Sequence, residues 1–498
     1  MSKKVMVIGI DSMDSLLLDK YIDDLPTFKK LKDSGPKIRS TSVFPPDSDT
    51  AWASIYTGLN PAEHGVVKFV DPLEKSIGIQ TQESESDLVR GKTFWDIASR
   101  RGKKVCVLLP HIAYPPWEVN GVMVSRSRIS GSIKQYPDYI EDYDLQKLRP
   151  PIGVPRRDPA TMRTLAKEYQ NLVINEFDFF QKMYLKDDWD IFFCYSSALD
   201  AIQHYFWNYC DPESQDYPED DSLKDIIWDF YVLYDTLIGK LLTLVDSETT
   251  VFIVSDHGHG GRPPKLVNIN EILRRHGFLS CENMNATSNI FCWLRSKGIE
   301  IISKHDLGWI ASKVLTMIPQ TKRISTITGG FNPESSIAYT TDLSGIKAYT
   351  YGGVKINLDL ILPDKYEVTR EKIITLLKDT LQDKYTWIKK REDLYHGEFI
   401  DQYPDIIIQL HEGYGLGCNV NTPIISDAYT SNIVPGSHRG DTPIFFMING
   451  KSNISVAEIT MMDIAPAVLK AIGIDLSDFY FEDHGAPTAY CNVNSDIM

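Results

Sequence analysis

The chain has 498 residues, which suffices for one large domain with insertions or for two or three smaller domains. Hydrophobic residues make up 43% and charged residues 24%, as is ordinary for a globular protein. The net charge of −15 and the pI near 5.2 argue against a general binder of nucleic acid or of anionic membranes, because both need a basic surface. A small anionic substrate stays open, since a metal ion can hold it locally.

The N-terminal stretch MSKKVMVIGID has two lysines but no long apolar run, so we expect no signal peptide. No apolar run approaches the roughly 18 residues of a membrane span. The seven cysteines are scattered, odd in number and without a CxxC pair, which favours reduced thiols over a disulfide framework. We therefore predict a cytoplasmic protein, and the sequence carries no signal for its oligomeric state.

Short apolar runs rich in β-branched or aromatic residues are typical of buried strands. In chain order these runs lie at 5–10, 104–109, 191–196, 250–255, 405–410 and 443–448. Helical patterns lie between them, at 159–186, 221–246 and 366–382. Buried strands that alternate with helices predict an α/β fold, a three-layer sandwich with a mostly parallel central sheet.

Two segments fit this alternation poorly. Residues about 110–158 are rich in Tyr, Pro and Arg, and residues about 281–350 match neither a strand nor a long helix well. We expect both to be insertions or lid elements near the active site, and we predict one catalytic domain over residues 1–498. Arg126 and Arg128, in the first segment, are candidates for lining a substrate pocket.

Acidic residues and histidines stand near the ends of several predicted strands, where ligands bind in open α/β sheets. There are three of each type: Asp11, Asp200, His204, Asp256, His257 and His438. Alone, each has an ordinary explanation as a helix cap, an i,i+4 pair or a loop histidine. Together they are ligands suited to Zn²⁺, and because one ion takes three or four ligands, six of them indicate two ions.

Residues 44–65, FPPDSDTAWASIYTGLNPAEHG, place two hydroxyls, Ser48 and Thr50, among two carboxylates, Asp47 and Asp49. Such a run is typical of a helix N-cap, because these oxygens accept hydrogen bonds from the first turn.

These motifs resemble the alkaline phosphatase superfamily, and within it the type I phosphodiesterase/nucleotide pyrophosphatase branch. The motifs are VIGIDSMD, the 44–65 segment, LDAIQHYFW, SDHGHGG with NINEIL, and GSHRG, in the family's order from residue 5 to about 472. The resemblance implies a metal-dependent hydrolase of small phosphate esters with two divalent ions, Zn²⁺ or alternatively Mn²⁺. It assigns one ion to Asp200, His204 and His438, and the other to Asp11, Asp256, His257 and the nucleophile.

The family's nucleophile lies ten residues before the Gly of a TG pair, which implies Ser48, counted back from Gly58, with Thr50 as the alternative. Its place at a helix start would put backbone N–H groups near the phosphate. Two features depart from the family pattern. Diesterases usually have Thr as nucleophile, and Ala51 stands where an Asn usually contacts a phosphoryl oxygen.

Other residues complete the prediction. Asp47 and Asp49 would repel a doubly charged monoester, which favours a diester as substrate. Arg439, beside His438, is a candidate contact to phosphate, and His259 is a candidate support for the ligands.

Four alternatives remain beside the diesterase. One is a phosphomonoesterase of the alkaline phosphatase type. A sulfatase is disfavoured because DSDTA lacks the Pro and Arg of the modification motif. A phosphoglycerate mutase relative lacks its further lysine and arginine contacts here. A catalytically inactive metal-binding protein is disfavoured by the complete ligand set.

Overall fold

The computed structural model describes most of the chain. It covers residues 3–34, 38–67, 82–128, 130–138, 143–153, 155–212, 217–281, 331–340, 348–428, 434–449 and 458–477, together with 300, 301, 307 and 310.

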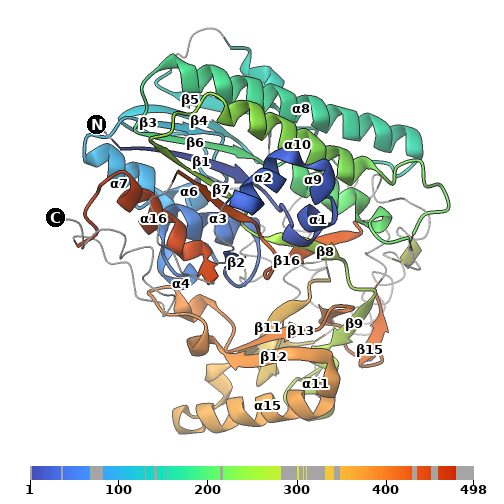
Figure 1. The fold of residues 1–498 in the computed structure, drawn as a ribbon. Coiled ribbons are helices and arrows are strands. Elements are labelled where there is room, and N and C mark those ends of the chain that lie inside the picture. Colours follow the sequence, from blue (N-terminus) through green and yellow to red (C-terminus); the bar gives the residue numbers. More distant parts are fainter. Residues whose placement is uncertain are drawn as a thin grey trace.

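A seven-stranded sheet forms the centre of the molecule, in the order β17-β7-β1-β6-β3-β4-β5 (Figure 1). Its strands are β1 (Lys4–Ile10), β3 (Val105–Leu108), β4 (Gly121–Arg126), β5 (Ile133–Tyr136), β6 (Ile191–Ser196), β7 (Thr249–Val254) and β17 (Phe445–Ile448). The five inner strands run parallel, and β5 and β17 are antiparallel edges. Every residue of β3 and β6 is buried, as expected of strands covered on both faces. The predicted mostly parallel sheet is confirmed.

Helices cover both faces of this sheet (Figure 1). One face carries α1 (Ser15–Lys20), α2 (Pro26–Ser34), α8 (Pro159–Lys186), α9 (Ala198–Phe206) and α10 (Ile226–Leu242). The other carries α3 (Ser48–Thr57), α7 (Phe94–Arg100) and α16 (Ile464–Ala471). Strand β1 serves both cores, because successive side chains point to opposite faces: Met6 and Ile8 pack with the first set, and Val5 and Val7 with the second. The layers are those of the predicted sandwich.

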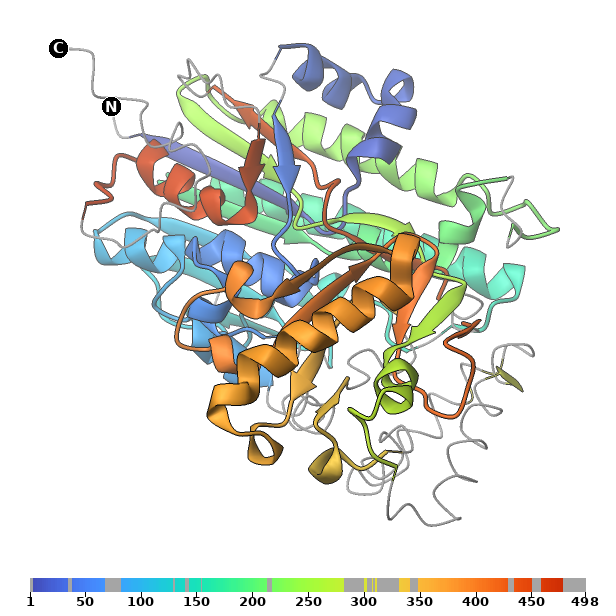
Figure 2. The same cartoon turned by 90° about the horizontal axis from the view of Figure 1, so that it is seen from below.

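A second sheet lies below the first and is antiparallel throughout, in the order β10-β11-β13-β12. Its strands are β10 (Ala338–Tyr339), β11 (Tyr351–Ile356), β12 (Tyr385–Lys390) and β13 (Ile406–Leu410). Helix α15 (Tyr366–Leu381) lies across these strands (Figure 2) and buries Ile373 and Leu377 against β13. The apolar run at 405–410 is therefore a strand, as predicted, but of this sheet. The apolar composition of this run indicates that the strand is buried, but it does not indicate which strands pair with it.

Smaller elements complete the fold. Strands β8 (Gly258–Gly261) and β16 (Gly436–Arg439) pair antiparallel, β14 (Tyr414–Gly417), β9 (Lys265–Asn268) and β15 (Ile425–Asp427) form a three-stranded sheet, and β2 (Arg39–Thr41) pairs with β18 (Glu458–Thr460). The short helices are α4 (Pro61–His64), α6 (Gln82–Val89) and α11 (Ile269–Arg275). Among the described helices, none combines the length and apolar character that crossing a membrane requires.

The two segments expected as insertions differ in outcome. Residues 121–126 and 133–136 are β4 and β5, so this part of 110–158 extends the central sheet and is not a lid. The run GVMVSR was missed because tyrosines and prolines surround it. Most of 281–350 lies outside the described residues. The division into domains stays a prediction.

Candidate active site

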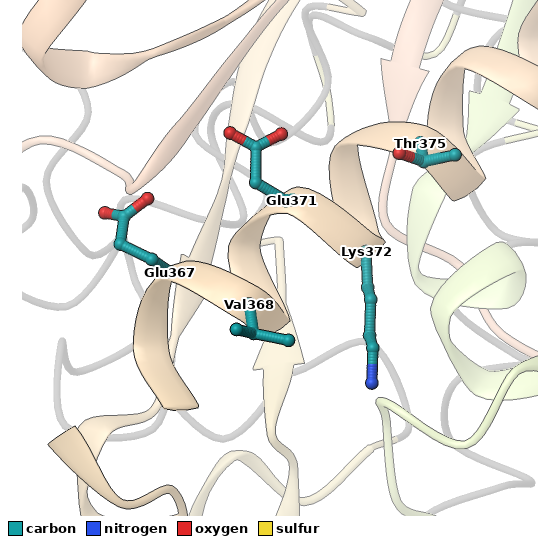
Figure 3. A pocket seen from close by; sticks show the side chains of 5 residues that line it. All are labelled: Glu367, Val368, Glu371, Lys372 and Thr375. Carbon is teal, nitrogen blue, oxygen red and sulfur yellow. The ribbon is translucent and has the colours of Figure 1, made fainter. Parts of the chain in front are cut away.

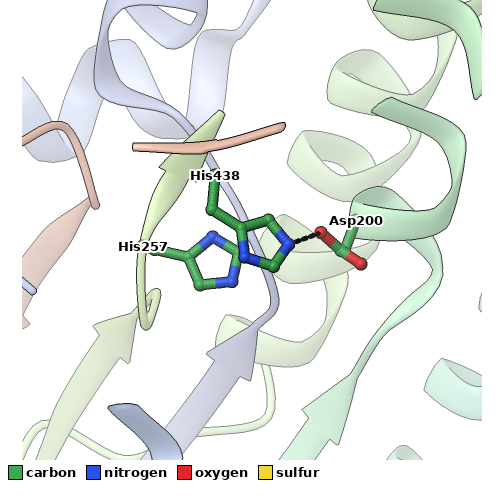
Figure 4. Close-up of side chains that lie close together, drawn as sticks. All are labelled: Asp200, His257 and His438. Atoms are coloured by element: carbon green, nitrogen blue, oxygen red, sulfur yellow. Dashed lines mark ion pairs between the residues drawn. The ribbon is translucent and has the colours of Figure 1, made fainter. Parts of the chain in front are cut away.

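The predicted site residues converge at the carboxyl end of the parallel strands. Asp11 directly follows β1, and Asp256 and His257 follow β7. Helix α9, which follows β6, carries Asp200 and His204 on one face. The β8–β16 ladder adds His438, which stands opposite His259. Figure 4 shows Asp200, His257 and His438 pointing toward one another from three different elements.

The first group of ligands is a triangle of three atoms. Asp200 Oδ1 lies 3.4 Å from His204 Nε2 and 3.5 Å from His438 Nε2, and the two Nε2 atoms are 3.0 Å apart. Each ring donates its Nδ1–H to a carbonyl, His204 to Gly436 and His438 to Pro46. A neutral ring that donates from Nδ1 has a lone pair at Nε2. The lone pairs of the two Nε2 atoms therefore face and repel each other, and a cation between them would remove this repulsion.

The second group surrounds His257 Nε2. Asp256 Oδ2 and Ser48 Oγ each lie 3.1 Å from this atom, and Asp11 Oδ1 lies 3.6 Å from it. His257 donates its Nδ1–H to the Gly258 carbonyl, so its Nε2 also presents a lone pair. Asp11 Oδ1 and Asp256 Oδ2 are buried and have no hydrogen-bond partner within the described part of the chain. Orphaned buried oxygens of this kind are costly unless a cation meets them.

The other oxygen of each carboxylate is fixed. Trp52 Nε1 donates to Asp11 Oδ2 at 3.3 Å, and the Tyr195 hydroxyl donates to the same oxygen. The Ser12 amide donates to Asp256 Oδ1 at 3.1 Å. These hydrogen bonds orient Oδ1 of Asp11 and Oδ2 of Asp256 toward His257, as the partners of metal ligands usually do.

The spacing of the donors fits divalent cations. Tetrahedral Zn²⁺ with N and O ligands places neighbouring ligand atoms about 3.3–3.6 Å apart, given bonds of about 2.0–2.2 Å. Two triplets of ligand atoms lie within 4.8 Å of one another: Asp200, His257 and His438, and Asp11, Asp256 and His257. His257 belongs to both triplets, and its ring stacks on that of His438 with centroids 4.0 Å apart. The two candidate ion positions are therefore adjacent.

Burial sets the protonation of these groups. It raises the pKa of Asp11 well above its usual range, with the Asp256 and Asp200 charges adding to the effect, and it raises the pKa of Asp256 to about 7. Burial lowers the pKa of His257 and of His438. Burial would also raise the pKa of Asp200, but the adjacent His204 and His438 rings hold it well below its usual range. The neutral imidazole of His257 beside the carboxyl groups of Asp11 and Asp256 is a set of ligands suited to a cation.

Ser48 is the first residue of α3, as the sequence predicts for a capped helix start. Asp47 is the N-cap, and its side chain accepts from the Asp49 amide at 3.2 Å. Thr50 is fully buried, and its hydroxyl donates to the Val66 carbonyl at 3.3 Å. Of the two hydroxyls, that of Ser48 therefore contacts the candidate ligands, whereas that of Thr50 donates its hydrogen bond to a backbone carbonyl.

Asp49 is buried and paired, which the sequence did not reveal. Its Oδ1 lies 2.8 Å from His111 Nε2 and accepts a hydrogen bond from Arg128 Nη1. His111 follows the carboxyl end of β3, the position that led to the other site residues, but it was assigned to an insertion. Tyr195 was read only as part of a buried strand. The strand-end rule could have found His111, whereas no sequence signal marks Tyr195.

The other predicted contacts have partners of their own. Arg439 Nη1 pairs with Glu412 at 2.9 Å and Nη2 with Asp441 at 3.2 Å. His259 is buried, its Nδ1 lies 2.7 Å from Ser12 Oγ, and its ring lies 4.7 Å from that of His204. This packing is what a support for His204 requires. A phosphate contact by Arg439 would compete with two carboxylates.

A surface hollow on the second sheet lies apart from this cluster, on α15 (Figure 3). Its lining residues are Glu367, Val368, Glu371, Lys372 and Thr375. Glu367 and Glu371 both pair with Lys390, so their charges are balanced. The hollow has no feature of a metal or catalytic site.

The fold and this site define a class, the hydrolases of phosphate esters. Within that class the chain belongs to the type I phosphodiesterase / nucleotide pyrophosphatase family, whose model matches residues 5–423. No curated protein matches the sequence.

Solved structures resemble the chain over nearly its whole length. Phosphonoacetate hydrolase from Sinorhizobium meliloti 1021, in complex with phosphonoacetate, is 15% identical with a TM-score of 0.58. Human ectonucleotide pyrophosphatase / phosphodiesterase 5 is 14% identical with a TM-score of 0.50, as is an inactive variant of the murine protein in complex with AMP. Each alignment covers 95% of this chain and 96% of the other. At these identities the likeness concerns the fold.

Proposed function

We propose that the protein is a metal-dependent phosphodiesterase of the nucleotide pyrophosphatase type, with Ser48 as nucleophile. The observation that carries this proposal is the position of Ser48 Oγ at the first residue of α3, 3.1 Å from His257 Nε2. Around the same nitrogen lie Asp11 Oδ1 and Asp256 Oδ2, which have no hydrogen-bond partner among the described residues. A hydroxyl, a helix N-terminus and a cation site then meet at one point, as phosphoryl transfer requires.

The candidate ligands form two groups, one for each ion. Asp200, His204 and His438 would hold one divalent ion, and Asp11, Asp256 and His257 the other. Bound there, the two ions would supply positive charge on either side of the phosphoryl group. Zn²⁺ suits the N and O ligands, with Mn²⁺ as the alternative.

Ser48 Oγ would attack phosphorus, which forms a phosphoseryl ester and breaks the bond to the leaving oxygen. Water would then cleave this ester and restore the hydroxyl. Because Ser48 begins α3, amides of the first turn would lie near the phosphate and would favour its negative charge. Thr50 is the weaker candidate, because its hydroxyl donates to the Val66 carbonyl.

The preference for a diester rests mainly on the family. Repulsion of a monoester by Asp47 and Asp49, which the sequence predicted, is weaker in the structure. Asp49 is paired with Arg128 and faces His111, so its charge repels a substrate little. Asp47 keeps its place beside Ser48 as the helix cap. A monoesterase therefore remains the alternative. A cytoplasmic location also stays a prediction, since two of the similar structures are named ectonucleotide enzymes.

The test is hydrolysis of bis-p-nitrophenyl phosphate and p-nitrophenyl phosphate by chelated protein with Zn²⁺ or Mn²⁺ added back. We expect diester turnover that needs the ion and falls at least about 1,000-fold in Ser48→Ala, in line with losses of catalytic nucleophiles. The matched control is Thr50→Val, which keeps the volume and should stay active. Full activity of Ser48→Ala would reject the nucleophile, and preference for the monoester would favour the monoesterase.

A further inference from the structure

His111 connects the helix that carries Ser48 to the carboxylate of Asp11. Its ring is largely buried, with 11% of the side chain exposed. It lies in the turn that follows β3, in a segment without any of the predicted ligands. Both ring nitrogens and the backbone amide contact groups close to the candidate active site.

Two contacts attach His111 to α3. His111 Nε2 lies 2.8 Å from Asp49 Oδ1, and the His111 amide donates to the Tyr56 hydroxyl at 2.9 Å. Asp49 directly follows Ser48, and Tyr56 lies two turns further along the same helix. Asp49 is only 2% exposed and is also paired with Arg128. His111 thus fixes both the start and the far end of the nucleophile's helix.

A third contact leads to Asp11. His111 Nδ1 lies 3.1 Å from the Tyr195 hydroxyl, which in turn donates to Asp11 Oδ2. A carboxylate that binds a metal ion is ionised and can only accept hydrogen bonds. When Asp11 is ionised, Tyr195 therefore donates its one hydroxyl proton to Asp11. The hydroxyl oxygen then accepts from His111 Nδ1–H, and Asp49 accepts from Nε2–H. In this arrangement the ring donates from both nitrogens, as only the protonated form of imidazole does, and the Asp49 carboxylate faces it.

We propose that His111 is a positioning residue that couples Ser48 to the ion held by Asp11. Through Asp49 it fixes the nucleophile, and through Tyr195 it orients the Asp11 carboxylate. This inference rests on the proposed function, since it assigns a role in the same site. It explains why an acidic residue can follow the nucleophile directly: the carboxylate of Asp49 is an anchor for His111.

The first readout is ion binding, measured by calorimetry with Zn²⁺ on chelated protein. His111→Phe keeps a ring and removes both hydrogen bonds, so one of the two ions should bind about 10–100-fold more weakly, as with other partners of metal ligands. Tyr195→Phe removes only the link to Asp11 and should weaken the same ion. If His111→Phe does not fold, Tyr195→Phe still tests the connection between His111 and Asp11.

The second readout is kcat at saturating ion. Tyr195→Phe should recover most of its kcat there, because α3 is still attached through Asp49. His111→Phe should stay at least about 10-fold below the wild type with KM little changed, since Asp49, the residue next to Ser48, loses the ring that anchors it. The matched control is His64→Phe. His64 also bonds α3, through Ser54 Oγ at 3.0 Å, but its other nitrogen accepts from the Val66 amide. It should lower the melting temperature and leave ion affinity unchanged.

Two results would overturn the inference. One is wild-type ion affinity and kcat in both His111→Phe and Tyr195→Phe. The other is a loss of ion affinity in His64→Phe as large as in His111→Phe, which would indicate general destabilisation. If the wild type binds two ions and cleaves neither phosphate ester, the proposed function fails, and the difference in ion affinity still decides the role of His111 as a support of Asp11.

Discussion

At the scale of one residue, Asp256 illustrates the cost of burying a carboxyl group against the lone pair of a histidine. Its Oδ2 faces the His257 Nε2 lone pair at 3.1 Å and has no hydrogen-bond partner within the described residues. Burial raises its pKa to about 7, so the folded protein holds a proton there that the unfolded chain releases near pH 4. In metal-free protein the folded state therefore binds more protons between pH 4 and 7, and stability falls as the pH rises through that window.

We predict that Asp256→Asn stabilises the metal-free protein at pH 8 by about 2–4 kcal/mol, because the variant no longer has to ionise a buried carboxyl group whose pKa is about 7. The new amide would donate to His257 Nε2 where the carboxylate met a lone pair. Urea unfolding at pH 5 and pH 8 measures the effect, which should be small at pH 5. With saturating Zn²⁺ the order should reverse, since the variant loses a ligand. A variant less stable than the wild type in both states would contradict this account.

At the scale of elements, the β8–β16 ladder brings His438 to the site and depends on glycine. A Cβ at Gly436 would lie 2.3 Å from His259 Nε2, 2.4 Å from the Gln203 carbonyl oxygen and 2.8 Å from His204 Cα. Real Cβ atoms do not come so close, so α9 and β16 could not pack as they do. The close approach of these backbones is what brings His204 Nε2 within 3.0 Å of His438 Nε2.

Gly436→Ala should therefore weaken the binding of one ion by about 10–100-fold, the loss typical of displaced supports of metal ligands. Calorimetry with Zn²⁺ measures the change, and ester turnover should fall with it. The matched control is Gly261→Ala in the same ladder, where the new Cβ would meet Trp207 Nε1 at an ordinary 3.5 Å. Equal ion affinity in the two variants would show that α9 and β16 can separate without disturbing the ligands.

A buried ion pair anchors the start of α9. Arg126 Nη1 donates to Glu176 Oε1 at 2.6 Å, and Arg126 Nη2 donates to Ser197 Oγ at 3.0 Å, directly before the helix. Glu176 is fully buried and also accepts from Ser196 Oγ at 2.5 Å. Arg126, a candidate pocket residue by sequence, is thus engaged in the core. Two residues of the same arginine-rich stretch have separate tasks, since Arg128 pairs with Asp49.

Arg126→Met should destabilise the protein by about 3–5 kcal/mol, because it leaves the Glu176 carboxylate buried without its partner. Adding Glu176→Gln should recover part of the loss, and urea unfolding measures both. Lys182→Ala is the matched control on the same helix as Glu176. Its pair with Asp178 is exposed, so the change should be under about 0.5 kcal/mol. A loss no larger than in the control would mean that Glu176 becomes neutral or solvated at little cost.

At the scale of the whole molecule, the candidate ligands come from four distant parts of the chain. Asp11 follows β1, Asp200 and His204 lie on α9, Asp256 and His257 follow β7, and His438 lies on β16. Ions bound among them would link the N-terminal strand β1 to strand β16, more than 400 residues away in sequence. Such binding stabilises only the folded state.

Chelation should therefore lower the melting temperature on the order of 5 °C, since each ion at 100 times its dissociation constant contributes about 2.7 kcal/mol. Scanning fluorimetry with EDTA, and then with excess Zn²⁺ or Mn²⁺, measures the shift and its reversal. In Asp200→Ala/His257→Ala, which removes ligands from both groups, the shift should be nearly absent. A wild-type melting temperature that does not respond to chelation would argue against structural ions in the purified protein.

Most of the fold could be predicted because its strands are buried on both faces and therefore read as continuous apolar runs. Helix α8 begins and ends at the predicted residues 159 and 186, since its apolar period is long and Asp158 caps it. Strand β5 was missed because it is a short and partly exposed edge, and the inner strand β4 was missed because tyrosines and prolines surround its run. The run at 405–410 was recognised as a strand, but pairing with β11 and β12 depends on contacts that composition does not encode.

The sequence by itself determined the candidate ligands and the nucleophile's helix, because metal chemistry needs particular residue types and a helix start needs a cap. It also determined five of the seven strands of the central sheet, through their burial. Only the tertiary structure decided which oxygen of Asp11 has no hydrogen bond from the described part of the chain, that Asp49 is paired with Arg128, and that His111 and Tyr195 join the site. These features depend on distances between segments far apart in the chain, and such distances exist only after the layers have packed.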